Sequence, residues 1–122
     1  MTATPDLADR YLAAWNETDP ATRRALIAEV FAEDVTYTDP MADVAGHDGL
    51  DATIAAVHGM FPGFVFRLAG QADAHHDQVR FTWHLGPEGV EAPVIGSDVA
   101  VTGADGRIRT VLGFLDRVPA SA

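Results

Sequence analysis

The order in which two kinds of hydrophobic periodicity follow each other most constrains the fold of this chain. Up to about residue 63, apolar residues recur at helical spacing, apart from one short alternating stretch at 35–39. From Phe64 onwards the apolar residues alternate with a period of two, which is typical of β-strands. Helices followed by strands indicate an α+β fold, with helices packed on one face of a curved antiparallel sheet. Such a sheet, folded around a long helix, encloses an apolar pocket.

Three helices are predicted in the first part of the chain. Thr4-Pro5 starts the first, because Thr is a good N-cap and Pro suits the first helical position. Asp19-Pro20 repeats this signal, and Glu33-Asp34 ends the second helix. His47-Asp48 caps the third, which Gly59 and Pro62-Gly63 terminate. The expected helices therefore cover residues 5–16, 20–33 and 48–59, and the residues between 41 and 46 are expected to form a loop.

Five strands are predicted, one before the third helix and four after it. Pro40 stops the first strand, since proline cannot donate a ladder hydrogen bond. The last four strands are joined by turns and are expected to form a meander, with a tight connection at 103–106. The expected strands cover residues 35–39, 64–72, 79–85, 90–102 and 108–118.

Length and composition place the chain among single-domain globular proteins. Its 122 residues are 48% apolar, so residues 1–122 are expected to form one domain with one core. The 18 acidic residues against 8 basic ones give a net charge of −10, which argues against nucleic acids and anionic membrane surfaces as partners.

Cysteine usage and hydropathy exclude further classes. The chain has no cysteine, so disulfides, thiolate metal sites and a cysteine nucleophile are excluded. No apolar stretch approaches the ~20 residues that span a bilayer, and the N-terminus lacks the pattern of a signal peptide. A cytoplasmic protein is therefore expected. The His75-His76-Asp77 segment lies in a predicted turn, so no metal site is expected, and no nucleotide or flavin motif is present.

Three polar side chains lie in apolar frames of separate elements. Tyr11 lies on the apolar stripe of the first helix, Asp39 shares a strand face with Val35 and Tyr37, and Asp98 lies midway along the segment VIGSDVAV. Each is expected to point towards the interior. A phenol and two carboxyls that converge in an apolar cavity would form a proton-transfer site, with one base and two donors that hold the resulting oxyanion.

Each of these residues also has a simpler interpretation. A buried Tyr11 needs only one hydrogen-bond partner. Asp39, which precedes Pro40, can form a turn by accepting from nearby backbone N–H groups. Asp98 can face solvent beside Val99. The sequence leaves these alternatives open.

The element order, together with the segments RYLAAWN, YTDP and GADGRIRTVLGFLD, resembles the nuclear transport factor 2-like superfamily, and within it the SnoaL-like and ketosteroid isomerase-like branch. The resemblance covers about residues 6–117. It implies a cone-shaped curved sheet wrapped by three helices around a deep cavity, and a homodimer that pairs through the outer sheet surface. By resemblance, Asp39 is the base, and Tyr11 with a neutral Asp98 forms the oxyanion hole.

These features predict a cofactor-free enzyme that transfers a proton next to a carbonyl of a small hydrophobic molecule, as in ketosteroid isomerisation or polyketide cyclisation. The alternative is a non-catalytic domain that holds a hydrophobic ligand or serves as a dimeric scaffold. Epoxide hydrolysis is less favoured, because it needs an inward arginine and those in the strands fit outer faces. The residues expected to line the pocket are Trp15, Tyr37, Val57, Phe61, Trp83 and Phe114.

Overall fold

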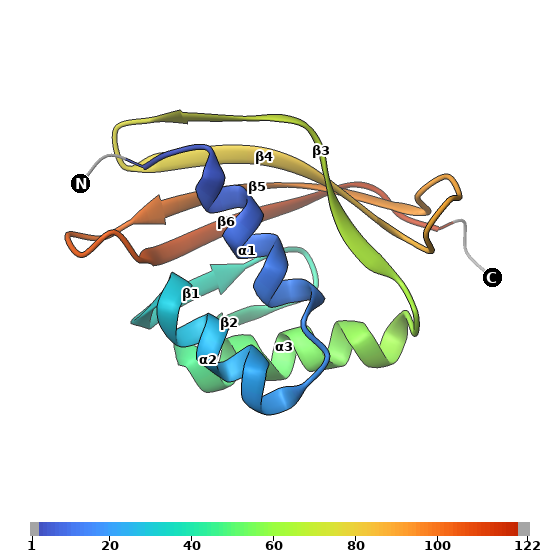
Figure 1. The fold of residues 1–122 in the computed structure, drawn as a ribbon, viewed down its shortest axis with the longest axis horizontal. Coiled ribbons are helices and arrows are strands. Elements are labelled where there is room, and N and C mark those ends of the chain that lie inside the picture. The colour runs from blue at the N-terminus through green and yellow to red at the C-terminus, as the bar shows by residue number, and fades with distance from the viewer. Residues whose placement is uncertain (1–2, 120–122) are drawn as a thin grey trace.

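Six strands form one curved sheet, and three helices pack against it (Figure 1). The computed structural model describes residues 3–119. In chain order, the elements are α1 (Asp6–Asn16), α2 (Pro20–Val30), β1 (Phe31–Thr38), β2 (Asp43–Ala45), α3 (Gly46–Met60), β3 (Val65–His75), β4 (Gln78–Gly86), β5 (Val94–Thr102) and β6 (Ile108–Arg117).

The sheet is mixed, with the strand order β2-β1-β6-β5-β4-β3. The predicted meander of the last four strands is confirmed, since each pairs antiparallel with the next. The expectation of a purely antiparallel sheet is wrong for β1, which runs parallel to β6. A parallel pair needs a long connection, and here the connection contains α3 and four other strands.

The boundary between α2 and β1 lies earlier than the sequence pattern predicts. The side chain of Asp19 accepts from the backbone N–H of Thr22, so α2 begins as expected. It ends at Val30 rather than at Glu33-Asp34, and Phe31 already belongs to β1. Phe31 is fully buried and pairs with Ile108 of β6. By its apolar character alone, Phe31 could lie on a helix face or in a strand. Its pairing with β6 places it in a strand.

Two further differences from the expected strands have a local reason. The expected loop at 41–46 contains β2, which pairs antiparallel with β1 so that Tyr37 lies opposite Val44. β5 begins at Val94 rather than at Val90, directly after Pro93, whose nitrogen cannot donate to the ladder.

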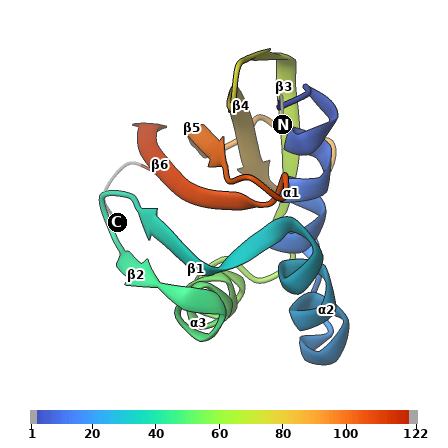
Figure 2. The ribbon, with the colours of Figure 1, turned by 90° about the vertical axis from the view of Figure 1, so that its left-hand side faces the viewer.

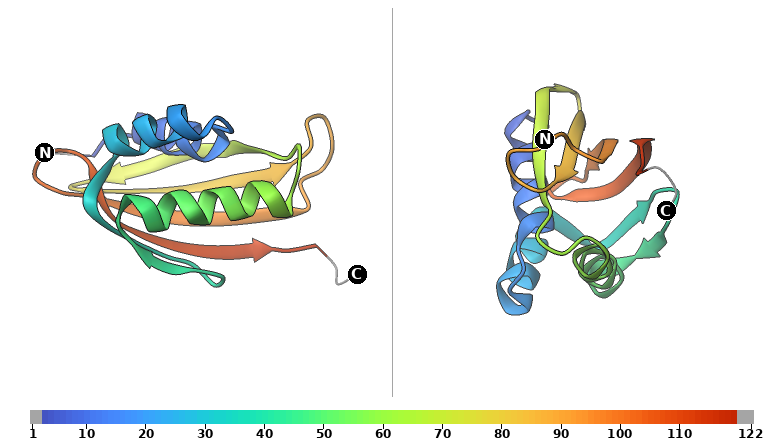
Figure 3. Two further views of the ribbon diagram at one scale, coloured as in Figure 1. Left: turned by 90° about the horizontal axis from the view of Figure 1, so that it is seen from below. Right: turned by 90° about the vertical axis from the view of Figure 1, so that its right-hand side faces the viewer.

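Curvature of the sheet brings β1 and β2 round towards α3 (Figure 2). In Figure 3, α3 runs along the sheet, while α1 and α2 form a second group of helices that contact each other. Aromatic rings fill the space between α1 and the sheet. The ring centroid of Tyr11 lies 5.0 Å from that of Phe81 and 5.6 Å from that of Phe31. None of the helices within residues 3–119 is long and apolar enough to cross a membrane.

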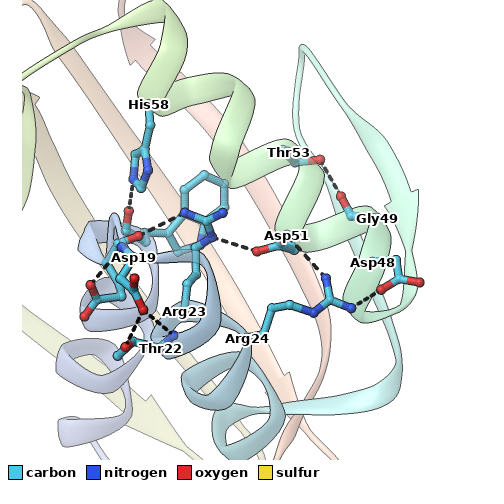
Figure 4. A network of polar contacts seen from close by, with 11 residues as sticks. Asp19, Thr22, Arg23, Arg24, Asp48, Gly49, Asp51, Thr53 and His58 are labelled. Atoms are coloured by element: carbon cyan, nitrogen blue, oxygen red, sulfur yellow. Dashed lines mark hydrogen bonds and ion pairs between the residues drawn. The ribbon is translucent and has the colours of Figure 1, made fainter.

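Polar contacts fix α3 against the other two helices (Figure 4). Arg23 of α2, whose exposed fraction is only 5%, donates from Nε to Oδ1 of Asp51 at 2.7 Å. Arg24 pairs with both Asp48 and Asp51 at the surface. Near the other end of α3, a ring nitrogen of His58 lies 2.6 Å from the carbonyl oxygen of Trp15. The position of α3 is therefore set at both ends.

Replacement of Asp51 by alanine is expected to lower the free energy of unfolding by about 3 kcal/mol, because it leaves the buried Arg23 guanidinium without its carboxylate. Asp48→Ala is the matched control. The side chain of Asp48, which pairs with Arg24, is 90% exposed, so its loss should change the free energy of unfolding little. Urea unfolding of both variants measures the difference. Equal losses in the two variants would mean that the Arg23 pair does not hold α3.

Candidate active site

A cavity of about 720 Å³ lies between α3, the end of α1 and the inner face of the sheet. Five of the six residues expected to line a pocket do line it: Trp15, Tyr37, Val57, Phe61 and Trp83. All three candidate catalytic residues also contribute to its wall. Most of the other lining residues are apolar, among them Ala52, Ala56, Phe66, Leu85, Val94 and Leu115.

Phe114 does not line the cavity, and the expectation that it does is wrong. It is 63% exposed on the outer face of β6, next to the buried Gly113. The cause is an irregularity in the pairing of β5 with β6, where Val101 lies opposite Thr110 but Thr102 lies opposite Ile108. One extra residue in a strand reverses the faces of all that follow, so Phe114 turns outward although Ile108 is buried.

Asp98 of β5 points inward and is 3% exposed. The hydroxyl of Tyr11 donates to its Oδ2 at 2.7 Å, and the indole Nε1–H of Trp83 donates to the same oxygen at 3.1 Å. Burial raises the pKa of Asp98 to about 6, although the hydrogen bonds from Tyr11 and Trp83 act in the opposite direction. The nearby Asp39 adds to the increase in this pKa. The solvent-facing interpretation of Asp98 is thereby excluded.

Asp39, at the end of β1, both forms the turn and lines the cavity. Its Oδ1 accepts from the backbone N–H groups of Met41 at 2.7 Å and Ala42 at 2.8 Å. Its Oδ2 accepts a short hydrogen bond from the hydroxyl of Tyr37. The two interpretations of Asp39 in the sequence are therefore compatible, because the turn holds the carboxylate at the cavity wall.

Gly113 of β6 separates the two carboxyl groups. It lies opposite Asp98 in the β5–β6 ladder, and Leu112, which precedes it, lies opposite Thr38 in the β1–β6 ladder. A Cβ atom built on Gly113 would lie 2.8 Å from Oδ1 of Asp98 and 3.2 Å from Cβ of Asp39. Because glycine has no side chain, the side chains of Asp39 and Asp98 can both lie close to Gly113.

The cavity provides hydrogen-bond donors but no fixed positive charge. Burial raises the pKa of Tyr11 well above its ordinary value and also raises the pKa of Tyr37, so both phenols stay protonated donors. Among the lining residues within 3–119, none is Lys, Arg or His. The cavity therefore suits an uncharged, mainly apolar ligand whose polar atom meets the two carboxyl groups.

Comparison with known proteins agrees with this architecture. The model of the SnoaL-like domain family matches residues 8–111. The chain belongs to the SnoaL-like domain family. A comparison with curated protein sequences gave no match.

Solved structures of SnoaL-like proteins share the fold. A candidate isomerase of the SnoaL-like family from Agrobacterium tumefaciens strain C58 is 42% identical, with a TM-score of 0.86 over 90% of this chain and 94% of that one. A candidate ketosteroid isomerase from Kribbella flavida is 17% identical, with a TM-score of 0.70 over 97% of this chain and 81% of its own. A candidate polyketide cyclase from Sinorhizobium meliloti is 18% identical, with a TM-score of 0.70 over 93% and 95%. The last two show the fold alone.

Sequence reasoning missed the glycines that shape this SnoaL-like site. Gly113 separates the carboxyl groups, and Gly96 lies opposite Trp83 in the β4–β5 ladder. A glycine inside a strand pattern often marks a close approach of other atoms. That signal was present at both positions, but it does not say which side chain makes the approach.

The raised pKa of Asp98 predicts how stability depends on pH. The native state binds this proton more tightly than the unfolded state, so stability falls as pH rises from the ordinary aspartate value of 3.8 through about 6. Relative to the wild type, Asp98→Asn is expected to gain about 3 kcal/mol of unfolding free energy between about pH 3.5 and about pH 7.5. Urea unfolding over that range measures this difference. A pH-independent difference would contradict the burial effect.

Proposed function

We propose that this protein is a cofactor-free enzyme that moves a proton next to a carbonyl group of a small, mainly apolar molecule, in an isomerisation or a ring closure. The observation that carries the proposal is that the side chains of Asp39 and Asp98 lie beside Gly113 and line the same apolar cavity. Their environments differ, and such a difference separates an acid from a base.

Asp39 is assigned as the base. Its carboxylate is held by Met41, Ala42 and Tyr37 at the cavity wall, so it meets the substrate in one orientation. It takes a proton from the carbon next to the carbonyl. The electron pair of that C–H bond forms a C=C bond, and the π pair of the carbonyl moves to its oxygen to give an enolate. In an isomerisation, Asp39 returns the proton to another carbon. In a ring closure, the enolate carbon bonds to the carbon of a second carbonyl, whose oxygen becomes an alkoxide and takes the proton from Asp39.

Asp98 is assigned as the group that stabilises the enolate oxygen. Burial favours its neutral form, which can donate a hydrogen bond. One donor aimed at a developing oxyanion in a dry site lowers the activation free energy by about 3 kcal/mol. Tyr11 donates to Oδ2 of Asp98 in this structure, so it orients this carboxyl group. Its hydroxyl reaches the ligand only by turning away from Asp98.

The similarity to named structures supports this assignment. The protein from Agrobacterium tumefaciens, named as a candidate isomerase, shares 42% of its sequence with this chain over most of both chains. The other two relatives are named as a candidate ketosteroid isomerase and a candidate polyketide cyclase. Both reactions begin with proton removal next to a carbonyl.

The second candidate function is the binding of a hydrophobic ligand without chemistry. One observation favours it: both oxygens of Asp39 already accept from protein donors. In that case the carboxylate fixes the turn after β1 and the cavity only encloses the ligand.

The two functions differ in the exchange of acidic C–H protons. A simple ketone such as 2-tetralone, followed by NMR in heavy water, exchanges the protons next to its carbonyl faster when a base is aimed at them. The wild type is expected to accelerate this exchange, and Asp39→Asn is expected to lose about 100-fold or more of the acceleration. Asp43→Asn, an exposed carboxylate in the same hairpin, is the control and should retain the rate. Equal rates in both variants would favour the binding function.

The pH dependence of this exchange tests the role of Asp98. If neutral Asp98 stabilises the enolate, the enzymatic rate falls as pH rises through about 6, because the acid loses its proton. Asp98→Asn, whose amide donates at every pH, should lack this fall. A rate that rises through the same pH would instead identify Asp98 as the base.

A further inference from the structure

Two tryptophans line the cavity, and the hydrogen bonding of their indole N–H groups differs. Nε1–H of Trp83 donates to Oδ2 of Asp98 at 3.1 Å. Nε1 of Trp15 is buried and has no hydrogen-bond partner among residues 3–119. An apolar wall needs neither N–H group, so the hydrogen bond of Trp83 indicates a role beyond shaping the cavity.

The two donors of Asp98 act on one oxygen. Tyr11 and Trp83 both donate to Oδ2, and two hydrogen bonds occupy both lone pairs of a carboxyl oxygen. An indole N–H can only donate, so Trp83 cannot accept a proton from Oδ2, and the hydroxyl of Tyr11 donates to the same oxygen in this structure. When Asp98 is neutral, its proton therefore belongs on Oδ1.

Oδ1 is the oxygen of Asp98 that lies next to Gly113. It is the atom of Asp98 that a Cβ on Gly113 would meet, and Asp39 lies on the far side of that position. Among residues 3–119, no side chain or backbone group forms a hydrogen bond with Oδ1. A ligand in the cavity can therefore accept from Oδ1 while both hydrogen bonds to Oδ2 stay in place.

Gly96 allows the indole ring to occupy this position. It lies opposite Trp83 in the β4–β5 ladder and two residues before Asp98, on the same face of β5. A Cβ atom built on Gly96 would lie only 2.6 Å from Cε2 of the Trp83 ring and would overlap Cζ2. The ring therefore lies over the glycine, which directs its N–H towards Asp98. Any larger residue at this position displaces the indole.

We propose that Trp83, lying over Gly96, is a positioning residue that leaves Oδ1 of Asp98 as the oxygen that donates to the ligand. The inference rests on the proposed function, because it assigns the direction of the donor in that reaction. It also gives Trp83 a polar role that the sequence analysis did not predict.

Other ionisable groups near Asp98 do not replace the indole. Tyr11 comes from α1, Tyr37 and Asp39 from β1, and Asp116 from β6. The hydroxyl of Tyr37 donates to Asp39, and the carboxylate of Asp116 accepts from Ser97. Tyr11 already donates to Oδ2, so the second donor to this oxygen is Trp83 alone among residues 3–119.

The indole signals in a proton–nitrogen NMR spectrum test the proposal without any substrate. The chain has two tryptophans, so the spectrum has two indole signals, which Trp15→Phe and Trp83→Phe assign. The Trp83 signal is expected to shift with a midpoint near pH 6 and to remain in slow exchange with water on both sides of it, because Oδ2 accepts in both states of Asp98. The Trp15 signal is the internal control and should not follow this titration.

Two variants complete the experiment. In Asp98→Asn, the Trp83 signal should lose its titration. In Gly96→Ala, which keeps the indole but displaces it, the signal should lose both the titration and its protection from exchange with water, while an unchanged Trp15 signal shows that the fold persists. A Trp83 signal that does not titrate in the wild type, or that loses protection at low pH, overturns the proposal.

Kinetics then separate this inference from the proposed function. Trp83→Phe is expected to slow ketone exchange by about tenfold through kcat, with KM nearly unchanged, since it keeps a ring in the wall and loses one hydrogen bond to Asp98. An unchanged kcat overturns the positioning role. If the wild type exchanges no ketone protons but the Trp83 signal titrates as expected, the proposed function fails while the arrangement of Trp83 and Asp98 holds.

Discussion

A carboxyl group in an apolar interior costs free energy unless it is neutral or receives hydrogen bonds. The cavity of this protein is arranged around one such group, Asp98. Asp98 is almost completely buried, and its two donors come from elements far apart in the chain, Tyr11 on α1 and Trp83 on β4. These bonds connect the first helix to the centre of the sheet. The donors offset part of the burial cost but leave the pKa of Asp98 at about 6, within the range where a proton can be gained or lost.

The cavity beside Asp98 persists because its walls are held from outside. α3 forms one wall, and its position depends on the buried ion pair of Arg23 with Asp51 and on the contact of His58 with the carbonyl of Trp15. These contacts lie between helices, and Arg23, Asp51 and His58 do not line the cavity. The space can therefore stay open for a ligand without a loss of order in the surrounding elements.

Two glycines decide how closely the groups of the site approach one another. Gly113 lets the carboxyl groups of Asp39 and Asp98 lie on either side of one strand, and Gly96 lets the Trp83 ring lie against the backbone. At neither position does the backbone require a positive φ angle. The requirement comes from the neighbouring side chains, so even alanine, which has ordinary strand geometry, is expected to disturb the site.

Periodicity, composition and the segments around Tyr11, Asp39 and Asp98 determined the α+β class, the three helices and most of the residues expected at the cavity, because side-chain direction follows from local repeat. Only the tertiary structure decided that β1 pairs with β6, that Tyr11 and Trp83 share one oxygen of Asp98, and that Phe114 faces outward. The alternation of a strand predicts faces only until an extra residue interrupts the ladder, as it does after Ile108. Hydrogen bonds between distant elements depend on which strands become neighbours, and that choice arises from the packing of the whole chain.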